Sequence, residues 1–397
     1  MNKILYFLVG FFFLSSCTDQ NKNTIAFASD NPAERVVWER IRLADPNTGE
    51  IPRNIRQKEM MFAKTLPKSS VMSKANWIHR GPYNVGGRTR ALAMDVLDEN
   101  TLLAGGASGG MFRSTNGGQS WVMTTNPNQL HNVTCVSQDK RIGKENIWYF
   151  GSGELTGSSA SGGEAYYGGN GIYKSVDGGL SWDSLSVTAT NTNGFDSNFD
   201  FIWNLKTDQS NDSLDVVYAA TYGTIYRSQD GGNSWVKELG GGSTYYNNVE
   251  VTSNGTVYAT LSSDGLDKGI WRSVDGQNWT NITDANFPPV YGRIAIGINP
   301  SNEDEVYFLA AETDGYGQHT DVFFNGEAWT SLWKYDASDS SWVDLSLNIP
   351  ANQATSFDNF NAQGGYDLMV KVHPADPNIV YIGGTNLWRS TDGFTSP

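Results

Sequence analysis

Short apolar stretches recur from residue 90 to the end of the chain, separated by Gly, Asn, Asp and Ser. Their length and their β-branched and aromatic residues predict strands rather than helices. The strands fall into sets of four, of which the first comprises Ala91–Val96, Thr101–Ala107, Met111–Ser114 and Trp121–Thr124. Later sets have their first strands at Val133–Gln138, Ile202–Thr207, Val249–Thr252, Arg293–Ile298 and Leu368–Val372, and the last set offers only three strands.

In most sets the third strand runs into one phrase, Ser-x-Asp-Gly-Gly-x-Ser-Trp, with copies starting at Ser114, Ser175 and Ser228. A shorter copy starts at Ser273, and one at Ser390 reaches the end of the chain before any Trp. Glycines supply positive φ and the Asp or Asn side chain accepts hydrogen bonds from turn amides, so the phrase predicts a hairpin turn. A catalytic residue would not recur in every set, which makes the following residues structural: Asn116, Trp121, Asp177, Trp182, Asp230, Trp235, Asp275, Trp279 and Asp392.

The copies start roughly 45 to 60 residues apart, which is the repeat length of a four-stranded propeller blade. The sequence therefore predicts an all-β fold, a β-propeller of about six blades over residues 76–397. Two completions of the sixth blade stay open. Either Trp77-Ile-His79 supplies its missing strand, or the chain is truncated at its C-terminus and belongs to a larger ring.

The residues before the strands have a different pattern. Pro32–Leu43 and Ile55–Leu66 carry apolar residues at helical spacing. At the start of the chain, Lys3, an apolar run and Leu14-Ser15-Ser16-Cys17 look like a bacterial lipobox, in which Cys17 is acylated. We expect a lipoprotein signal peptide at 1–17, a tether and short helical segment at 18–75, and a protein anchored in the outer membrane or cell surface by lipid alone.

Composition changes this picture in two respects. The formal charge is −14, from 28 basic and 42 acidic residues, and no basic patch accompanies it, which argues against nucleic acid as a partner. Once Cys17 is acylated only Cys135 remains, so the mature chain forms no internal disulfide and depends on its apolar core.

The repeated phrase resembles the Asp-box, or BNR repeat, of sialidases, sortilin-type propellers and xyloglucanases. The helical preface followed by Gly81-Pro82 and Gly86-Gly87-Arg88 resembles secreted Bacteroidota proteins with sortilin-like propellers. This resemblance spans nearly the whole mature chain. It implies an extracellular propeller, but the group has no uniform activity.

The long insertions of the predicted blades gather on the face opposite the repeated turns, where binding sites usually lie. The ligand-binding residues predicted on this loop face are Tyr166, Tyr167, Asp314, His319 and Trp329. Glu154 and Glu312 leave equivalent strands of different blades and are the candidate catalytic carboxylates. No metal or cofactor is predicted, although the oxygen-rich loop from Glu312 to Asp321 could hold calcium without matching an EF-hand.

Three functions follow from these features. The favoured one is binding of a glycan or protein ligand through the loop face, because binding needs no particular catalytic pair. The first alternative is a glycoside hydrolase of the Asp-box propeller type, with carboxylates facing across a cleft. The sialidase motif Arg-Ile-Pro is absent, and Gly86-Gly87-Arg88 is its nearest analogue. The second alternative is a scaffold in envelope assembly or secretion.

Overall fold

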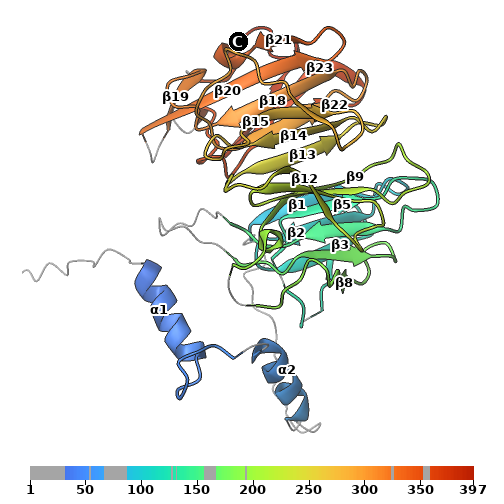
Figure 1. The fold of residues 1–397 in the computed structure, drawn as a ribbon, viewed down its shortest axis with the longest axis vertical. Coiled ribbons are helices and arrows are strands. Elements are labelled where there is room, and N and C mark those ends of the chain that lie inside the picture. Colours follow the sequence, from blue (N-terminus) through green and yellow to red (C-terminus); the bar gives the residue numbers. More distant parts are fainter. Residues whose placement is uncertain are drawn as a thin grey trace, which may run out of the picture. The chain divides into compact units, whose positions relative to one another are not determined.

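The computed structural model describes residues 32–52, 55–66, 87–126, 128–130, 132–155, 167–192, 195–322, 326–351 and 358–397. The helices α1 (Pro32–Leu43) and α2 (Ile55–Thr65) confirm the two helical predictions (Figure 1). Residues up to Leu43 and residues from Ala44 onward form separate compact units. No helix in the described ranges is long and apolar enough to cross a bilayer. Cys17 and Trp77-Ile-His79 lie outside these ranges.

Six antiparallel sheets follow in chain order, which confirms the all-β propeller of blade-like sheets (Figure 1). Sheet one contains β1 (Thr89–Met94), β2 (Leu102–Gly106), β3 (Gly110–Ser114) and β4 (Val122–Met123). Sheet two contains β5 (Cys135–Gln138), β6 (Trp148–Gly151), β7 (Ile172–Ser175) and β8 (Asp183–Ser184). Sheet three contains β9 (Ile202–Thr207), β10 (Val217–Thr221), β11 (Thr224–Ser228) and β12 (Val236–Gly240). Sheet four contains β13 (Asn247–Val251), β14 (Val257–Leu261), β15 (Gly269–Ser273) and β16 (Trp279–Asn281).

The fifth sheet differs from the prediction. It contains β17 (Ile294–Ile298), β18 (Glu305–Ala311), β20 (Gly326–Asp336) and β21 (Ser341–Asp344), but also β19 (Gln318–Val322). Sequence reasoning treated the insertion from Glu312 to Trp329 as a loop. In the structure β19 pairs with the first half of β20, from Gln318 opposite Thr330 to Val322 opposite Gly326. The insertion therefore extends the sheet.

The sixth sheet has three described strands, β22 (Met369–His373), β23 (Asp376–Gly383) and β24 (Leu387–Ser390). Apolar clusters fill each of the five junctions between consecutive sheets. Among the described residues, no such cluster joins sheet six to sheet one. There Leu92 of β1 and Leu387 of β24 are 69% and 66% exposed. This junction depends on polar contacts, which are described with the site below.

The repeated turns are held by their acidic side chains. Asp177 accepts hydrogen bonds from the amides of Leu180 and Ser181 at 3.1 and 2.9 Å, and from the Ser181 hydroxyl at 2.6 Å. Gly178 and Gly179 have φ of 76° and 81°, a region that favours glycine. The side chains of Asn116, Asp230, Asp275 and Asp392 make corresponding bonds within their turns.

The environment of each turn tryptophan depends on whether a neighbouring sheet packs against it. Trp182 is 2% exposed, packs on Phe150 with ring centroids 4.7 Å apart, and donates a hydrogen bond to Thr124 of sheet one at 3.0 Å. It therefore wedges against the preceding sheet, as expected of a large aromatic anchor. Trp121 of the first sheet is 38% exposed, since no apolar cluster forms on that side of sheet one among the described residues.

Replacing Asp177 by Ala is expected to lower the free energy of unfolding by about 2 kcal/mol, because amides bonded to a charged acceptor lose it. Asn should be tolerated, as at Asn116. Partial burial raises the pKa of Asp177, but hydrogen bonds from Ser181, Ser175 and Leu180 outweigh it and lower that pKa overall. The wild-type carboxylate therefore contributes stability above the unfolded-state pKa and loses it as pH falls through the folded-state pKa. Urea titrations of wild type, Asp177→Asn and Asp177→Ala at neutral and acidic pH measure both effects; equal stability at all pH values would contradict this role.

Candidate functional site

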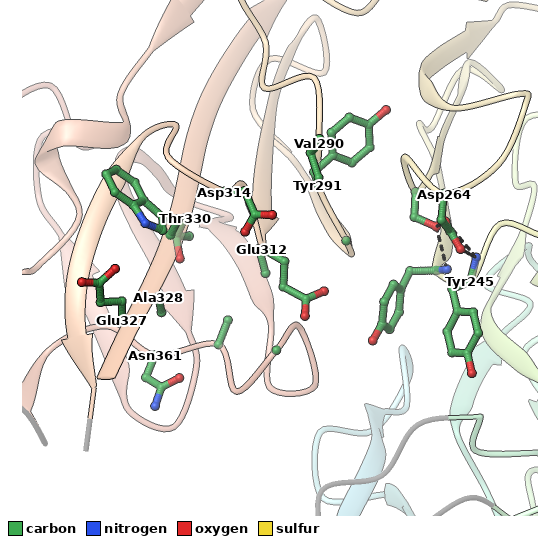
Figure 2. A pocket seen from close by; sticks show the side chains of 17 residues that line it. Tyr245, Asp264, Val290, Tyr291, Glu312, Asp314, Glu327, Ala328, Thr330 and Asn361 are labelled. Carbon is green, nitrogen blue, oxygen red and sulfur yellow. Dashed lines mark hydrogen bonds between the residues drawn. The ribbon is translucent and has the colours of Figure 1, made fainter. Parts of the chain in front are cut away.

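A cavity of about 520 Å³ opens where loops of sheets four, five and six converge with the link between sheets three and four (Figure 2). These loops are second-to-third turns and links between sheets, the classes of loop that the sequence placed on the binding face. The walls of the cavity combine four aromatic side chains with four carboxylates: Tyr245, Tyr246, Tyr291, Trp329, Asp264, Glu312, Asp314 and Glu327.

The aromatic wall is held in place from behind. Tyr245 and Tyr246 lie edge to face with ring centroids 5.7 Å apart, and the Trp203 indole donates a hydrogen bond to the Tyr245 carbonyl at 2.8 Å. The backbone amide of Tyr291 donates a hydrogen bond to the Ser263 hydroxyl at 2.9 Å. The backbone that carries these rings is therefore held in place, and the rings offer surfaces on which a ligand can stack.

Glu312 occupies a strained position just beyond β18. Its φ is 58°, a left-handed conformation that non-glycine residues seldom adopt and that often marks functional sites. A Cβ added at Gly292 would lie 2.1 Å from a Glu312 carboxylate oxygen, so the absence of a side chain at Gly292 makes room for this carboxylate. Burial, with the nearby charges of Asp314 and Asp264, raises the pKa of Glu312.

Asp264 has the opposite surroundings. Its carboxylate accepts hydrogen bonds from the Tyr245 amide at 3.1 Å and from the Ser262 hydroxyl at 2.5 Å. Within the described ranges, no group donates a hydrogen bond to Glu312. Figure 2 shows Glu312 in the middle of the cavity and Asp264 beside Tyr245 on another side. One cavity thus contains a carboxyl group whose pKa is raised and a second carboxylate that hydrogen bonds hold in one orientation.

Glu312→Gln is expected to raise the free energy of unfolding at neutral pH and to leave it nearly unchanged in acid. The raised folded-state pKa means that the native protein binds more protons than the unfolded chain in the interval between the two pKa values. Native stability therefore falls as pH rises through that interval, and Gln removes the loss. Denaturant unfolding at pH 4 and pH 7 measures it, with Glu327→Gln as the exposed control from the same cavity. A larger gain in acid than at neutrality would contradict the sign.

The structure brings three of the predicted residues together, since Glu312, Asp314 and Trp329 all line this cavity. His319 is not among the residues that line the cavity, but its ring lies tilted against Trp329 with ring centroids 5.0 Å apart, and its Nε2 is 3.7 Å from Glu327. Tyr167 is elsewhere, in a backbone bridge with Glu154, and Tyr166 lies outside the described residues.

Glu154 is not among the residues that line the cavity with Glu312. Its side chain is buried, 2.9 Å from Arg88 Nη2 and 3.6 Å from Arg90 Nε, and it accepts a 2.7 Å hydrogen bond from the Tyr366 hydroxyl. Arg88 also donates to that hydroxyl at 2.8 Å. These contacts join sheets one, two and six, so the geometry of Glu154 is that of a structural ion pair.

Sequence reasoning missed Asp264 and Tyr291. The signal for Asp264 was present, because it follows the second strand of its sheet just as Glu154 and Glu312 follow theirs. Tyr291 carried no such signal, since it lies in a link with no recurring pattern.

Two other chemistries find little support among the described residues. Among the described residues, no three His, Cys, Asp or Glu side chains are grouped so that they could hold a metal ion. Nothing in the structure tests whether the Glu312–Asp321 segment could hold calcium. The thiol of Cys135 is buried, and burial raises its pKa to about 11, which disfavours the thiolate needed of a nucleophile.

Comparison with known proteins defines a class. No protein-family model matches the chain. A xyloglucanase from a Paenibacillus species is 23% identical over 375 aligned residues, covering 81% of this chain and 35% of that protein. The chain thus spans about a third of the length of this relative. It is a six-bladed β-propeller with xyloglucanase-like neighbours.

Two solved structures are similar in fold. An ancestral GH74 enzyme has a TM-score of 0.55 at 21% identity, covering 77% of this chain and 36% of that one. The Niastella koreensis GH74 enzyme has a TM-score of 0.54 at 20% identity, covering 78% and 45% of the two chains. At this level of identity the likeness supports the propeller fold alone.

Proposed function

We propose that this protein is a glycoside hydrolase that acts on a xyloglucan-type polysaccharide, with the cavity around Glu312 as part of its active site. One observation carries the proposal: the carboxyl group of Glu312, whose pKa is raised by desolvation and by nearby carboxylates, and the hydrogen-bonded carboxylate of Asp264 line one cavity walled by aromatic rings. Glycoside hydrolysis uses two such carboxyl groups, one to protonate the leaving oxygen and one to activate water or attack the sugar.

Glu312 takes the role of general acid in this proposal. A proton donor must be neutral at the working pH, and desolvation, the nearby charges of Asp314 and Asp264, and the lack of a hydrogen-bond donor among the described residues all favour the neutral form of Glu312. Asp264 takes the second role, because its bonds to the Tyr245 amide and the Ser262 hydroxyl fix the orientation of its carboxylate in the cavity. The rings of Tyr245, Tyr246 and Trp329 offer stacking surfaces for the flat faces of glucose units.

Similarity to the Paenibacillus xyloglucanase supports the choice of substrate. That match spans about a third of the relative, so the reaction of this chain requires its own measurement. Release of reducing ends by the purified protein, on xyloglucan, mixed-linkage glucan, mannan and a protein-linked glycan, provides it. We expect release from xyloglucan above the others.

Binding without hydrolysis is the second candidate, favoured by the same aromatic wall. Retention of the protein on immobilised xyloglucan without any reducing-end release would replace the hydrolase by a glycan-binding propeller. Neither retention nor release would overturn both proposals.

A further inference from the structure

A second cavity of about 740 Å³ lies among the first strands of the sheets, at the centre of the propeller. Five cationic side chains line it: Arg88, Arg90, Arg293, Lys206 and Lys371. The carboxylates available to them are Glu250 and Asp367 in the lining and Glu154 behind Arg88. The excess of positive charge is notable because the whole chain carries a formal charge of −14.

At the end formed by Arg88, Arg90 and Arg293, the cations outnumber their partners. Arg88 and Arg90 share Glu154. Arg293 forms no ion pair with a carboxylate among the described residues; its Nη1 donates to the carbonyls of Gly365 and Tyr366 at 3.1 and 3.0 Å. Desolvation, followed by repulsion from Arg90, lowers the pKa of Arg293 to about 9. The charge of Asp367 acts on Arg293, but also on Arg90 and Arg88, so three guanidinium groups share two carboxylates here.

In a second part of the cavity, lysine side chains outnumber the carboxylates. Lys206 and Lys371 share one carboxylate, with their ammonium groups 2.9 and 3.6 Å from Glu250 Oε1. Burial lowers the pKa of the neighbouring Lys140, and repulsion from Lys206 lowers it further. Two lining lysines thus face the single carboxylate of Glu250, and an added negative charge would be stabilised here.

We propose that the central cavity binds an acidic sugar, a small saccharide that carries a carboxylate. Guanidinium groups recognise planar carboxylates through paired hydrogen bonds, and ammonium groups add point charges. The volume suits a ligand of one or two sugar rings. Asn204 and Asn248 also line the cavity, and their amides are held by hydrogen bonds to each other and to the carbonyls of Val249 and Ile294, which gives the site a fixed wall. This site is separate from the Glu312 cavity and goes beyond the proposed hydrolase.

Calorimetric titration of the purified protein with glucuronate, glucose and inorganic phosphate tests the assignment. We expect glucuronate to bind at least 10-fold more tightly than glucose, and the affinity to fall in 0.5 M NaCl as cavity charges are screened. Equal binding of the two sugars, or no binding, would overturn the proposal. Phosphate binding as tight as glucuronate would overturn the assignment of a sugar, because the oxyanion alone would then suffice.

Variants locate the site. Lys206→Gln should weaken glucuronate binding about 10-fold, whereas Lys237→Gln, which removes the same charge from an exposed position on β12, should leave it unchanged. Glu250→Gln should tighten binding several-fold, because it removes a competing carboxylate from Lys206 and Lys371; weaker binding would contradict the proposed site. Equal losses from both lysine variants would show a general charge effect and contradict the site. Glu312→Gln should not change glucuronate affinity, so failure of either proposal leaves the other standing.

Discussion

Hydrolysis of xyloglucan by Glu312→Gln is expected to be about 100- to 10,000-fold slower in kcat than by the wild type, with a nearly unchanged KM. Gln has almost the shape of a protonated Glu and can still donate a hydrogen bond to the glycosidic oxygen. It cannot transfer a proton to that oxygen as the bond breaks. The loss therefore falls on the chemical step rather than on binding.

Two further measurements separate a general acid from a carboxyl group whose pKa is raised but which takes no part in the reaction. Wild-type kcat should decline as pH rises through the raised pKa of Glu312, because the acid form is then lost. The Gln variant should lack that decline. It should also retain most of its rate on an aryl glycoside with an acidic phenol, a leaving group that needs no protonation.

Controls come from the same cavity. Glu327 is a carboxylate whose side chain is 69% exposed, so Glu327→Gln should keep full activity. Asp264→Asn should lose activity on both polysaccharide and aryl glycoside, since both reactions need the second carboxylate. Wild-type turnover by Glu312→Gln on xyloglucan would exclude Glu312 as the acid.

The strands and turns were predictable because their signals are local. Each Asp-Gly-Gly turn specifies its own hairpin, as Asp177 does through bonds to residues three and four positions away. The strand β19 was not predictable on the same basis. Gln318–Val322 has no apolar alternation, and it is a strand because β20 extends far enough to pair with it.

The site was predictable only in part, for a related reason. Glu312 and Trp329 could be selected from their loop, but the pairing of Glu312 with Asp264 depends on how two sheets pack. The small size of Gly292 that accommodates Glu312 is equally a tertiary effect. Glu154 looked equivalent to Glu312 by position in its sheet, and only the approach of Arg88 and Tyr366 from other sheets distinguishes it.

These contacts matter because, in the part of the chain that the structure describes, no apolar cluster like those at the other five junctions joins sheets six and one. Tyr366 precedes β22 of sheet six, and Arg88 precedes β1 of sheet one. Glu154 of sheet two accepts a hydrogen bond from the Tyr366 hydroxyl and forms an ion pair with Arg88. These contacts tie sheets six and one to sheet two. Arg90 adds a 3.0 Å bond to the Tyr366 carbonyl. A single buried carboxylate thus connects three sheets where sheets six and one meet.

Glu154→Ala is accordingly expected to lower the free energy of unfolding by about 3 kcal/mol, because it leaves two guanidinium groups without their buried anion. Tyr366→Phe removes one hydrogen bond and should cost about 1 kcal/mol. Urea unfolding measures both, with exposed Glu327→Ala as the matched control. At a temperature where it stays folded, Glu154→Gln should retain wild-type turnover, unlike Glu312→Gln. A stable but inactive Glu154→Gln protein would reverse the roles assigned to the two carboxylates.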